Sequence, residues 1–212
     1  EVGIKSLQYT LPESVSEDEL LKLINGLNLN KDIDGILVQL PLPKKINTEI
    51  ILNAINPSKD VDGFHIVNAA NIYLNREGVI PCTPLGCLII LRSIGQSLKG
   101  MHAVIIGRSN IVGKPMAQLL LNEDCTVTTV HSKSKNIEKI VKEADIIIAA
   151  VGIPNLVNEN WVKKESIIID VGINRINLEN KTKLVGDVNF NAVQSFASYI
   201  TPVPGGVGPM TI

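Results

Sequence analysis

The feature that most constrains the fold is a regular alternation, from residue 101 onward, of short apolar runs with segments of helical pattern. Four runs have the length of strands: His102–Ile106, Thr126–Val130, Asp145–Ala150 and Ser166–Val171. The last two are apolar at successive positions, as expected of strands buried on both faces of a sheet. Helical patterns lie between the runs, near residues 113–121 and 137–144. This alternation predicts an α/β fold with a parallel sheet.

The first hundred residues show a looser version of the same pattern. Strands are predicted at Lys5–Leu11 and Gly35–Leu40, and each is followed by a proline that cannot donate to a ladder. Ser16 and Glu19 match a capping box and so predict a helix start. A second helix is predicted near Thr48–Ile55.

The pattern then loosens between Asn56 and Thr83, where a loop is predicted. Thr83 and Pro84 resemble an N-cap with proline at the first helical position. The apolar helix expected from Leu85 to Ile94 ends at Gly95. We interpret this helix as the connection between two domains.

Composition excludes several classes of protein. Of the 212 residues, 45% are hydrophobic and 19% are charged, which is ordinary for a globular chain. The formal net charge of −1 gives no electrostatic reason to expect nucleic acid or an anionic membrane as a partner. No apolar run reaches the roughly 18 residues of a membrane-spanning helix. Cys82, Cys87 and Cys125 lack metal-ligand spacing, so small buried thiols in a reducing compartment are the simplest interpretation.

A glycine-containing turn, Gly107–Gly113, follows the first strand of the alternating unit and precedes a helix. Free amides and the positive end of a helix dipole at such a point would bind a pyrophosphate. Ser109 and Val112 replace the second and third glycines of the usual G-x-G-x-x-G pattern. The order of strand, turn, helix and strand therefore supports a dinucleotide site more strongly than the spacing does.

The segment after the second strand bears on which dinucleotide is bound. An NAD site usually has Asp or Glu there, to hold the ribose hydroxyls. This chain has the sequence HSKSK, from His131 to Lys135, without a carboxylate. A hydroxyl and two ammonium groups suit a ribose 2′-phosphate, and Arg108 would add a bidentate contact. NADP is therefore favoured, against the alternative that these bases form a solvated rim.

Two further glycine-containing loops follow predicted strands, at Val151–Pro154 and Gly172–Asn174. Open α/β sheets bind ligands at the carboxyl ends of their strands, and glycine lets the backbone approach a flat cofactor. Tight turns also use glycine, so each loop alone leaves both interpretations open. Together with Gly107 the two loops favour a cofactor cleft.

Polar groups also stand out in the first half of the chain. Gln39 ends an apolar strand, where a buried amide must be hydrogen-bonded either within the protein or to a ligand. Asp60, Asp62 and Gly63 fit a common Asx-type turn, and His65 has no nucleophile pattern beside it. Near the other end, the Gly/Pro-rich segment 201–209 either presents its backbone to a ligand or ends a strand.

Taken together and in this order, these segments resemble the bifunctional methylenetetrahydrofolate dehydrogenase/cyclohydrolase family. The resemblance covers essentially the whole chain. The matching stretches are DGILVQLPLP (Asp34–Pro43), KDVDGFH (Lys59–His65), PCTPLG (Pro81–Gly86), GRSNIVGKPM (Gly107–Met116), VTTVHSKS (Val127–Ser134), DVGIN (Asp170–Asn174) and TPVPGGVGPMT (Thr201–Thr211).

The resemblance implies a fold of two α/β domains, with a folate-binding domain built from the two ends of the chain. Residues 1–83 would belong to the folate-binding, catalytic domain, and residues 84–98 to a connecting helix. Residues 99–200 would form a Rossmann-like NADP-binding domain with a parallel sheet, and residues 201–212 would return toward the catalytic domain. Family members are typically homodimers, so a homodimer is expected, in the cytoplasm or in an organelle matrix.

The resemblance also implies roles for individual residues. Gln39 and Asp62 are the expected catalytic residues, beside the one-carbon unit and the pterin ring respectively. The expected substrate-binding residues are Gln39, Pro41, Asp62, Pro204 and Gly205. The expected cofactor-binding residues are Gly107, Arg108, Ser109, Ser132, Gly152, Gly172 and Ile173, and no metal is expected. The main catalytic lysine of the family precedes the segment matched by Glu1–Gly3, and the family's last helix follows the segment matched by Thr201–Thr211. We therefore expect sequence to be missing at both ends.

The activity implied is oxidation of methylenetetrahydrofolate with NADP+, followed by hydrolysis of methenyltetrahydrofolate to formyltetrahydrofolate. The expected partners are therefore tetrahydrofolate derivatives, in one-carbon metabolism. Two alternatives stay open. One is an NADP-dependent dehydrogenase of another small metabolite, and the other is a catalytically silent dinucleotide-binding module.

Overall fold

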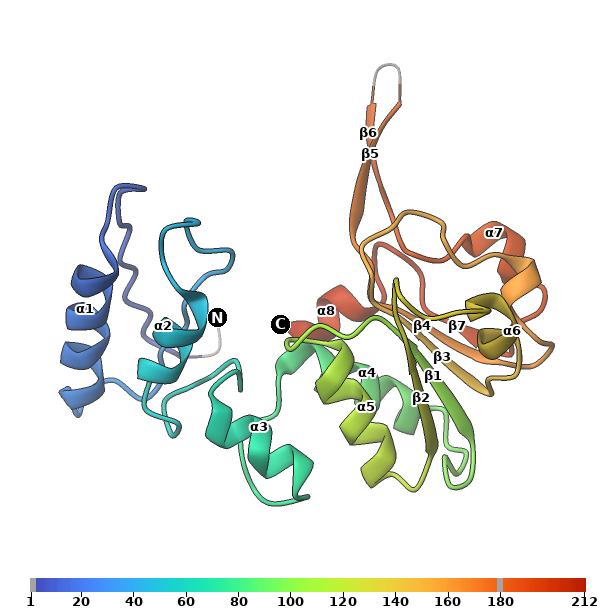
Figure 1. Ribbon diagram of the computed structural model, residues 1–212, viewed down its shortest axis with the longest axis horizontal. Coiled ribbons are helices and arrows are strands. Elements are labelled where there is room, and N and C mark those ends of the chain that lie inside the picture. Colours follow the sequence, from blue (N-terminus) through green and yellow to red (C-terminus); the bar gives the residue numbers. More distant parts are fainter. Residues whose placement is uncertain (1–2, 179–180) are drawn as a thin grey trace. The chain divides into compact units, whose positions relative to one another are not determined.

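The computed structural model describes residues 3–178 and 181–212. The chain divides into two compact units, Glu1–Val61 and Asp62–Ile212, whose helices and strands are labelled in Figure 1. The first unit contains α1 (Glu17–Leu29) and α2 (Thr48–Ala54). Both helices bury an apolar face in one small core, which consists of Leu20, Ile24, Ile36, Ile46, Ile51 and Ile55.

The predicted start of α1 is confirmed. The Glu19 backbone N–H donates to Ser16 Oγ at 3.3 Å, and the Ser16 backbone N–H donates to Glu19 Oε2 at 2.8 Å. This reciprocal pair satisfies donors that a helix start otherwise leaves free.

At the other end of α1, the Lys59 ammonium caps the helix. Lys59 Nζ donates to the carbonyls of Leu27, Asn28 and Asn30, at 3.1, 2.8 and 2.7 Å. A cation at this position neutralises the negative end of the helix dipole and satisfies carbonyls without an intrahelical donor. The segment that begins KDVDG is therefore anchored to α1 through its first residue.

Two predicted strands of the first unit are wrong. Residues 5–11 are exposed and form no strand, and Gly35–Leu40 is reduced to a single bridge between Ile36 and Asp60. A strand is stable only when a neighbour completes its ladder. Among the described residues of this unit the strand pairing is limited to that bridge, where the Ile36 N–H donates to the Lys59 carbonyl at 2.7 Å.

The second unit begins with α3 (Ile66–Tyr73) and α4 (Cys82–Ser93). Helix α3 lies where a loop was predicted. The His65 ring caps it, because Nδ1 accepts the Val67 N–H at 3.0 Å. Helix α4 follows Pro81 as its N-cap, so the predicted cap at Thr83 is wrong and the helix begins two residues earlier than predicted, at Cys82.

A five-stranded parallel sheet forms the centre of the second unit, in the order β2-β1-β3-β4-β7. The elements of this part are β1 (His102–Ile106), α5 (Gly113–Asn122), β2 (Thr126–Val130), α6 (Ile137–Lys142), β3 (Ile146–Ala149), the 3-10 turn η1 (Glu159–Trp161), β4 (Ile167–Asp170), α7 (Phe190–Val193), β7 (Tyr199–Ile200) and α8 (Val207–Thr211). The predicted parallel α/β fold is confirmed here, and each predicted strand lies within a residue of its expected bounds.

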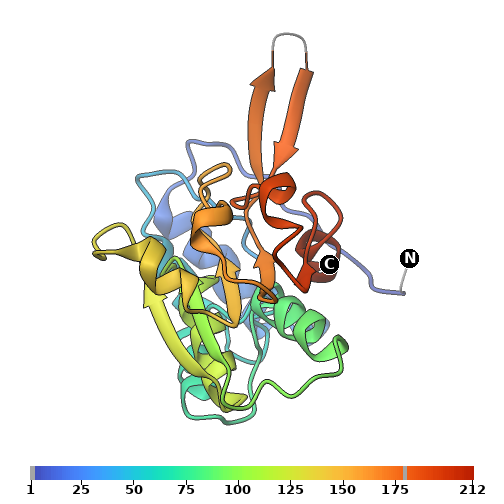
Figure 2. The same cartoon turned by 90° about the vertical axis from the view of Figure 1, so that its right-hand side faces the viewer.

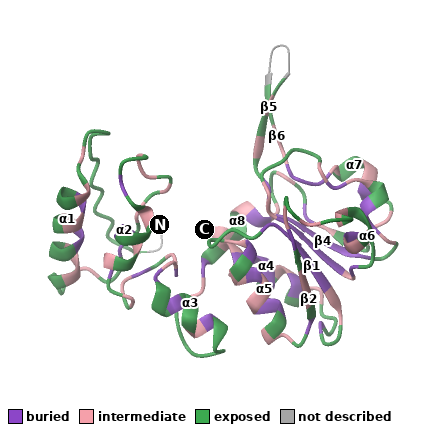
Figure 3. Ribbon diagram, in the orientation of Figure 1, coloured by how far each residue is buried: buried purple, intermediate pink, exposed green. Residues whose placement is uncertain are grey.

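Side chains alternate between the two faces of this sheet and build a core on each. On one face, Ile105 and Ile148 pack with residues of α4 and α5, such as Leu91 and Leu120. On the other face, Val104 and Ile147 pack with residues of α6, η1 and α7. Figure 3 shows that β1 and β4, in the middle of the sheet, are mostly buried. Burial on both faces explains why β3 and β4 are apolar at successive positions.

A two-stranded antiparallel ribbon interrupts the unit after β4. It consists of β5 (Asn174–Leu178) and β6 (Lys181–Val185), which pair with each other in a separate sheet. Figures 1 and 2 show that this ribbon projects away from the five-stranded sheet. It was not predicted.

No helix within the described ranges is long and apolar enough to cross a membrane. The three cysteines are free thiols, and Cys87 and Cys125 are buried as predicted. Cys82 is exposed at the start of α4, so the prediction of burial is wrong there. Burial raises the pKa of the Cys87 thiol to about 12, which makes it an inert core residue.

Candidate active site

The order of the strands defines one edge of the sheet as a ligand site. Strand β1 pairs with β2 on one side and with β3 on the other, so connections leave it in opposite directions. Open α/β sheets bind ligands at this point, beyond the carboxyl ends of the strands. The Gly107 N–H donates to the Val130 carbonyl at 2.9 Å, and the Ala150 N–H donates to the Ile106 carbonyl at 2.9 Å. The segments that follow β1, β2 and β3 therefore start side by side.

Gly107 fills a narrow position at this edge. Its φ is +120°, and a Cβ added there would lie 2.3 Å from the Ala150 carbonyl oxygen. Only glycine fits such a position without displacing backbone. Gly107 thus lets the turn after β1 pass close to the end of β3.

In the turn between β1 and α5, the amides at the start of the helix, which were expected to bind the pyrophosphate, already have acceptors within the turn. The Val112 and Gly113 N–H groups donate to Ser109 Oγ at 3.2 and 3.3 Å, and the Lys114 N–H donates to the Ser109 carbonyl at 3.0 Å. Ser109 therefore occupies the donors of the helix end. Among the described residues, no hydrogen bond uses the backbone amides of residues 108–111. The turn itself, more than the helix end, can donate to a pyrophosphate.

The segment after β2 is a tight turn held by its own side chains. The His131 N–H donates to Ser134 Oγ at 3.0 Å, and the Lys133 N–H donates to His131 Nδ1 at 3.2 Å. These bonds leave Ser132, Lys133 and Lys135 exposed to solvent. Arg108 is exposed in the adjoining turn. The arrangement gives one hydroxyl and three cations at neighbouring strand ends, with no carboxylate in the turn, and this fits a 2′-phosphate.

The loops after β3 and β4 also lie at this edge. Gly152 has a φ of +67° and open space around it, whereas Gly172 is buried. Each glycine is followed by an exposed isoleucine, Ile153 at 50% and Ile173 at 64% of full exposure. Exposed apolar side chains at a ligand edge suit the flat face of a ring. All seven predicted cofactor residues therefore follow the carboxyl ends of four adjacent strands, although their contact with a cofactor stays a prediction.

A buried carboxylate, Asp170, joins these loops at the end of β4. Its Oδ1 accepts the N–H groups of Gly172 and Asp187 at 3.0 and 2.9 Å, and its Oδ2 accepts the Val188 N–H at 2.9 Å. The Asp170 N–H in turn donates to Thr201 Oγ1 at 2.8 Å. Asp170 thus fixes the chain before and after the ribbon, and Thr201 ties the Gly/Pro-rich segment to the same point.

Burial raises the pKa of the Asp170 carboxyl from 3.8 to about 6, and the neighbouring Asp187 carboxylate adds to this rise while three backbone amides oppose it. A carboxyl whose pKa is higher in the folded state stabilises the fold below the unfolded pKa, and that stabilisation is lost as the pH rises through the folded pKa. We expect the free energy of unfolding to lose on the order of 3 kcal/mol from this group between pH 4 and pH 7. Urea denaturation at a series of pH values measures it. The variant Asp170→Asn is expected to show a flatter profile, and an unchanged slope would assign the effect to other groups.

The predicted substrate residues fall in different units. Gln39 and Pro41 belong to the first unit and are exposed, so the expectation that Gln39 is buried is wrong. The Gln39 amide donates to the Leu40 carbonyl at 3.0 Å. Asp62 begins the second unit, in a half-buried turn. That these residues border one pocket with Pro204 and Gly205 stays a prediction.

Pro204 and Gly205 lie in an exposed turn before α8. The peptide bonds Val203–Pro204 and Leu40–Pro41 are both cis. Helix α8 packs against α4, with Thr83 Oγ1 and Thr211 Oγ1 hydrogen-bonded at 3.1 Å. Two of the motifs singled out in the sequence, PCTPLG and TPVPGGVGPMT, are thereby brought together.

Two residues of the site were missed from the sequence. Asp170 was noticed as part of a motif but not as a site residue, and Asp187 was not noticed. Both are almost fully buried, at 3% and 0% exposure. For Asp170 the sequence did contain a signal, since it directly follows the apolar run Ile167–Ile169. A carboxylate at the end of a buried strand must be paired, which predicts a structural or functional role.

These features define the class of protein: a two-unit α/β protein whose larger unit has a parallel sheet with a switch point, the place at which such sheets bind dinucleotides. The model of the tetrahydrofolate dehydrogenase/cyclohydrolase catalytic domain matches residues 1–62, and the model of that family's NAD(P)-binding domain matches residues 81–212. The chain belongs to the tetrahydrofolate dehydrogenase/cyclohydrolase family.

Comparisons with individual proteins lead to the same family. The chain is 56% identical to Bifunctional protein FolD 1 of Acinetobacter baylyi, over all of this chain and 71% of that protein. It is also similar to the crystal structure of the bifunctional enzyme FolD from Campylobacter jejuni, with a TM-score of 0.95, 52% identity, and coverage of 99% of this chain and 73% of that one. The Trypanosoma brucei FolD structure, which is complexed with NADP cofactor and inhibitor, has a TM-score of 0.90 and 40% identity, with coverage of 95% and 70%.

Proposed function

We propose that the chain uses the edge formed by Gly107, Arg108, Ser109 and Ser132 to bind NADP+ for the two activities of its family. As a member of that family it is a bifunctional enzyme, a methylenetetrahydrofolate dehydrogenase and a methenyltetrahydrofolate cyclohydrolase. The observation that carries the cofactor assignment is the pair of adjoining turns after β1 and β2. One has amides without partners among the described residues, and the other has exposed Ser132 and lysines in place of an acid.

The residues present fit the cofactor on physical grounds. Gly107 leaves space that a Cβ would fill, and the turn after it can donate to a pyrophosphate. Arg108 and Ser132 are the proposed 2′-phosphate ligands. Gly152, Gly172 and Ile173 are proposed to border the nicotinamide. When bound, NADP+ supplies the hydride acceptor for the methylene carbon of the folate.

The substrate groups are proposed in the same way. Asp62 would hold the pterin ring by hydrogen bonds and so fix the orientation of the one-carbon unit. The Gln39 amide would lie beside that unit and help to orient water for the hydrolysis. Pro41, Pro204 and Gly205 would form the border of the pocket. Hydride transfer needs alignment more than a general base, in agreement with the cap role that the His65 ring plays.

The domain organisation and the state of the protein are further parts of this proposal. Residues 1–83 would form the catalytic domain and 84–98 the connecting helix, followed by the NADP-binding domain at 99–200 and a return segment at 201–212. A homodimer is proposed, and the projecting β5–β6 ribbon, whose outer strand edges pair with no other described strand, offers a contact for the second copy. Three free thiols support a reducing compartment such as the cytoplasm.

The assay of the purified full-length parent of this chain with methylenetetrahydrofolate, in the presence of NADP+ or NAD+, tests the proposal. We expect the absorbance of the methenyl product to appear with NADP+ and then to decay faster than its spontaneous hydrolysis. Faster turnover with NAD+ would overturn the cofactor assignment. Binding of NADP+ without any product would instead favour a silent binding module.

A further inference from the structure

Asp187 is a fully buried carboxylate at the point where the β5–β6 ribbon returns to the domain. Its Oδ2 accepts the N–H groups of Val151 and Gly152, at 2.7 and 3.0 Å. Its Oδ1 accepts Asn174 Nδ2 at 2.9 Å. The donors belong to the loop after β3 and to the first residue of β5, so one side chain links two segments far apart in the sequence.

The loop after β4 also rests on this carboxylate. A Cβ added to Gly172 would lie 2.3 Å from Asp187 Cγ, so the Gly172 backbone packs directly on the side chain. The Asp187 backbone N–H is in turn held by Asp170 Oδ1. A movement of the carboxylate would therefore displace both loops, because it is hydrogen-bonded to the loop after β3 and packed against the loop after β4.

Both supported loops carry a glycine followed by an exposed isoleucine, Ile153 in one loop and Ile173 in the other. Asp187 holds the backbone of Gly152 directly and packs against Gly172. It has no exposed surface of its own and so touches no ligand. Asp187 can therefore affect ligand binding only indirectly, by fixing how far apart the loops after β3 and β4 lie.

We propose that Asp187 is a positioning residue for the nicotinamide end of the cofactor, setting the spacing of the loops after β3 and β4. The inference rests on the proposed function, which assigns these loops to cofactor binding. It predicts an effect on NADP+ that is larger than any effect on the folate substrate.

The variant Asp187→Ala tests this. We expect the Kd for NADP+, measured by titration calorimetry, and the KM for NADP+ to rise about tenfold or more, because the loop after β3 loses its acceptor and the loop after β4 loses the side chain on which Gly172 packs. The KM for methylenetetrahydrofolate should change by less than about twofold. Asp187→Asn should stay within about threefold of the wild type, because its remaining oxygen can accept both backbone amides while Asn174 turns its own amide.

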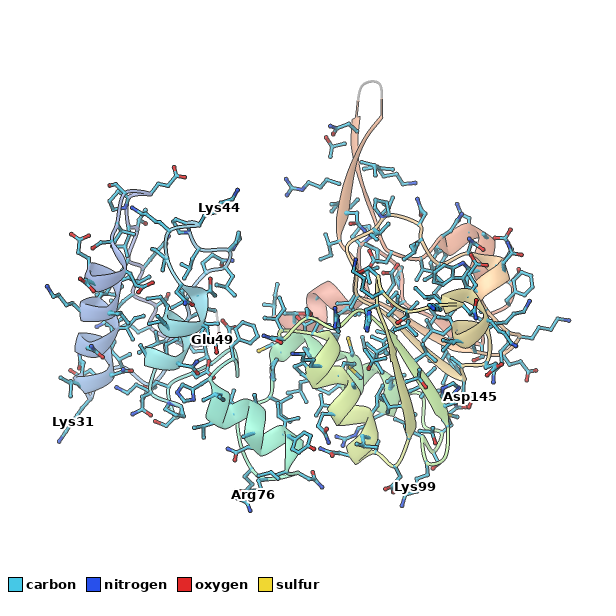
Figure 4. The ribbon with its side chains drawn as sticks, viewed as in Figure 1. Lys31, Lys44, Glu49, Arg76, Lys99 and Asp145 are labelled. Atoms are coloured by element: carbon cyan, nitrogen blue, oxygen red, sulfur yellow. The ribbon has the colours of Figure 1, made fainter. Side chains whose placement is uncertain are left out.

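Asp145→Ala is the matched control. Asp145 Oδ2 accepts the His102 N–H at 2.7 Å. His102 is the first residue of β1 and Asp145 directly precedes β3, so this bond lies at the opposite edge of the sheet. Figure 4 labels Asp145 there. This variant should lower the melting temperature but leave the Kd for NADP+ unchanged. If Asp187→Ala behaves in the same way as Asp145→Ala, Asp187 is only structural and the proposal is wrong.

A second variant covers the case in which Asp187→Ala does not fold. Asn174→Ala removes one of the three donors and should raise the Kd for NADP+ about threefold. An unchanged Kd in that variant would also overturn the proposal. Wild-type protein that binds no NADP+ at all would refute the proposed function itself, before any variant is compared.

Discussion

Gly107→Ala is expected to lower kcat/KM for NADP+ by about 100-fold or more, the largest functional effect of any single methyl group in this chain. The new Cβ would lie 2.3 Å from the Ala150 carbonyl oxygen, which belongs to backbone and cannot rotate away. The turn or the end of β3 must shift, and the amides of residues 108–111 shift with it. Dehydrogenase kinetics and calorimetric titration with NADP+ measure the loss.

Gly100→Ala controls for the backbone conformation alone. Gly100 also has a positive φ, +75°, but a Cβ there meets no atom within 4 Å. It lies before β1, at the edge of the sheet opposite the cofactor turn. This variant should cost about 1 kcal/mol of stability and leave NADP+ affinity unchanged. Equal losses of affinity in the two variants would show that strain, and not the clash with Ala150, is responsible.

Gly186→Ala is expected to have the largest effect on stability, a loss of about 3–5 kcal/mol in the free energy of unfolding. Its Cβ would lie 1.7 Å from Asp170 Oδ2. The carboxylate would have to leave the amides of Asp187 and Val188, which are buried and have no other acceptor among their described contacts. Chemical denaturation followed by circular dichroism measures the change.

Gly208→Ala is the control for this second variant. Gly208 lies within α8 and a Cβ there also meets nothing within 4 Å. Alanine is favourable in a helix, so the stability should be unchanged or slightly higher. A loss in Gly186→Ala no larger than in the control would mean that Asp170 can move, and that its hydrogen bonds contribute little.

The central sheet could be predicted because burial on both faces leaves a direct trace in the sequence. Runs such as Ile146–Ala149 and Ile167–Asp170 are apolar at successive positions, and the turn after β1 has glycine at Gly107, where φ is positive. The turn Gly107–Gly113 was found for the same reason. In these places local preference and tertiary environment agree.

The errors arise where a tertiary partner decides the outcome. Lys5–Leu11 has the composition of a strand, but it has no neighbour to pair with among the described residues. Helix α3 was missed because its cap is the His65 ring and not one of the residues usual at that position. Asp187 was missed because its role depends on residues 35 and 36 positions earlier in the chain.

The hydrogen bonds of Asp170 and Asp187 at the base of the β5–β6 ribbon separate changes in the ribbon from changes in the loops after β3 and β4. Asp170 and Asp187 close the ends of the excursion from Gly172 to Gly186, so the path of the ribbon does not determine where the loops after β3 and β4 lie. Insertions and deletions are tolerated best where no buried backbone depends on them. The ribbon is therefore the segment in which length can diverge between relatives, or in which a label can be inserted, while the chemistry at the sheet edge is preserved.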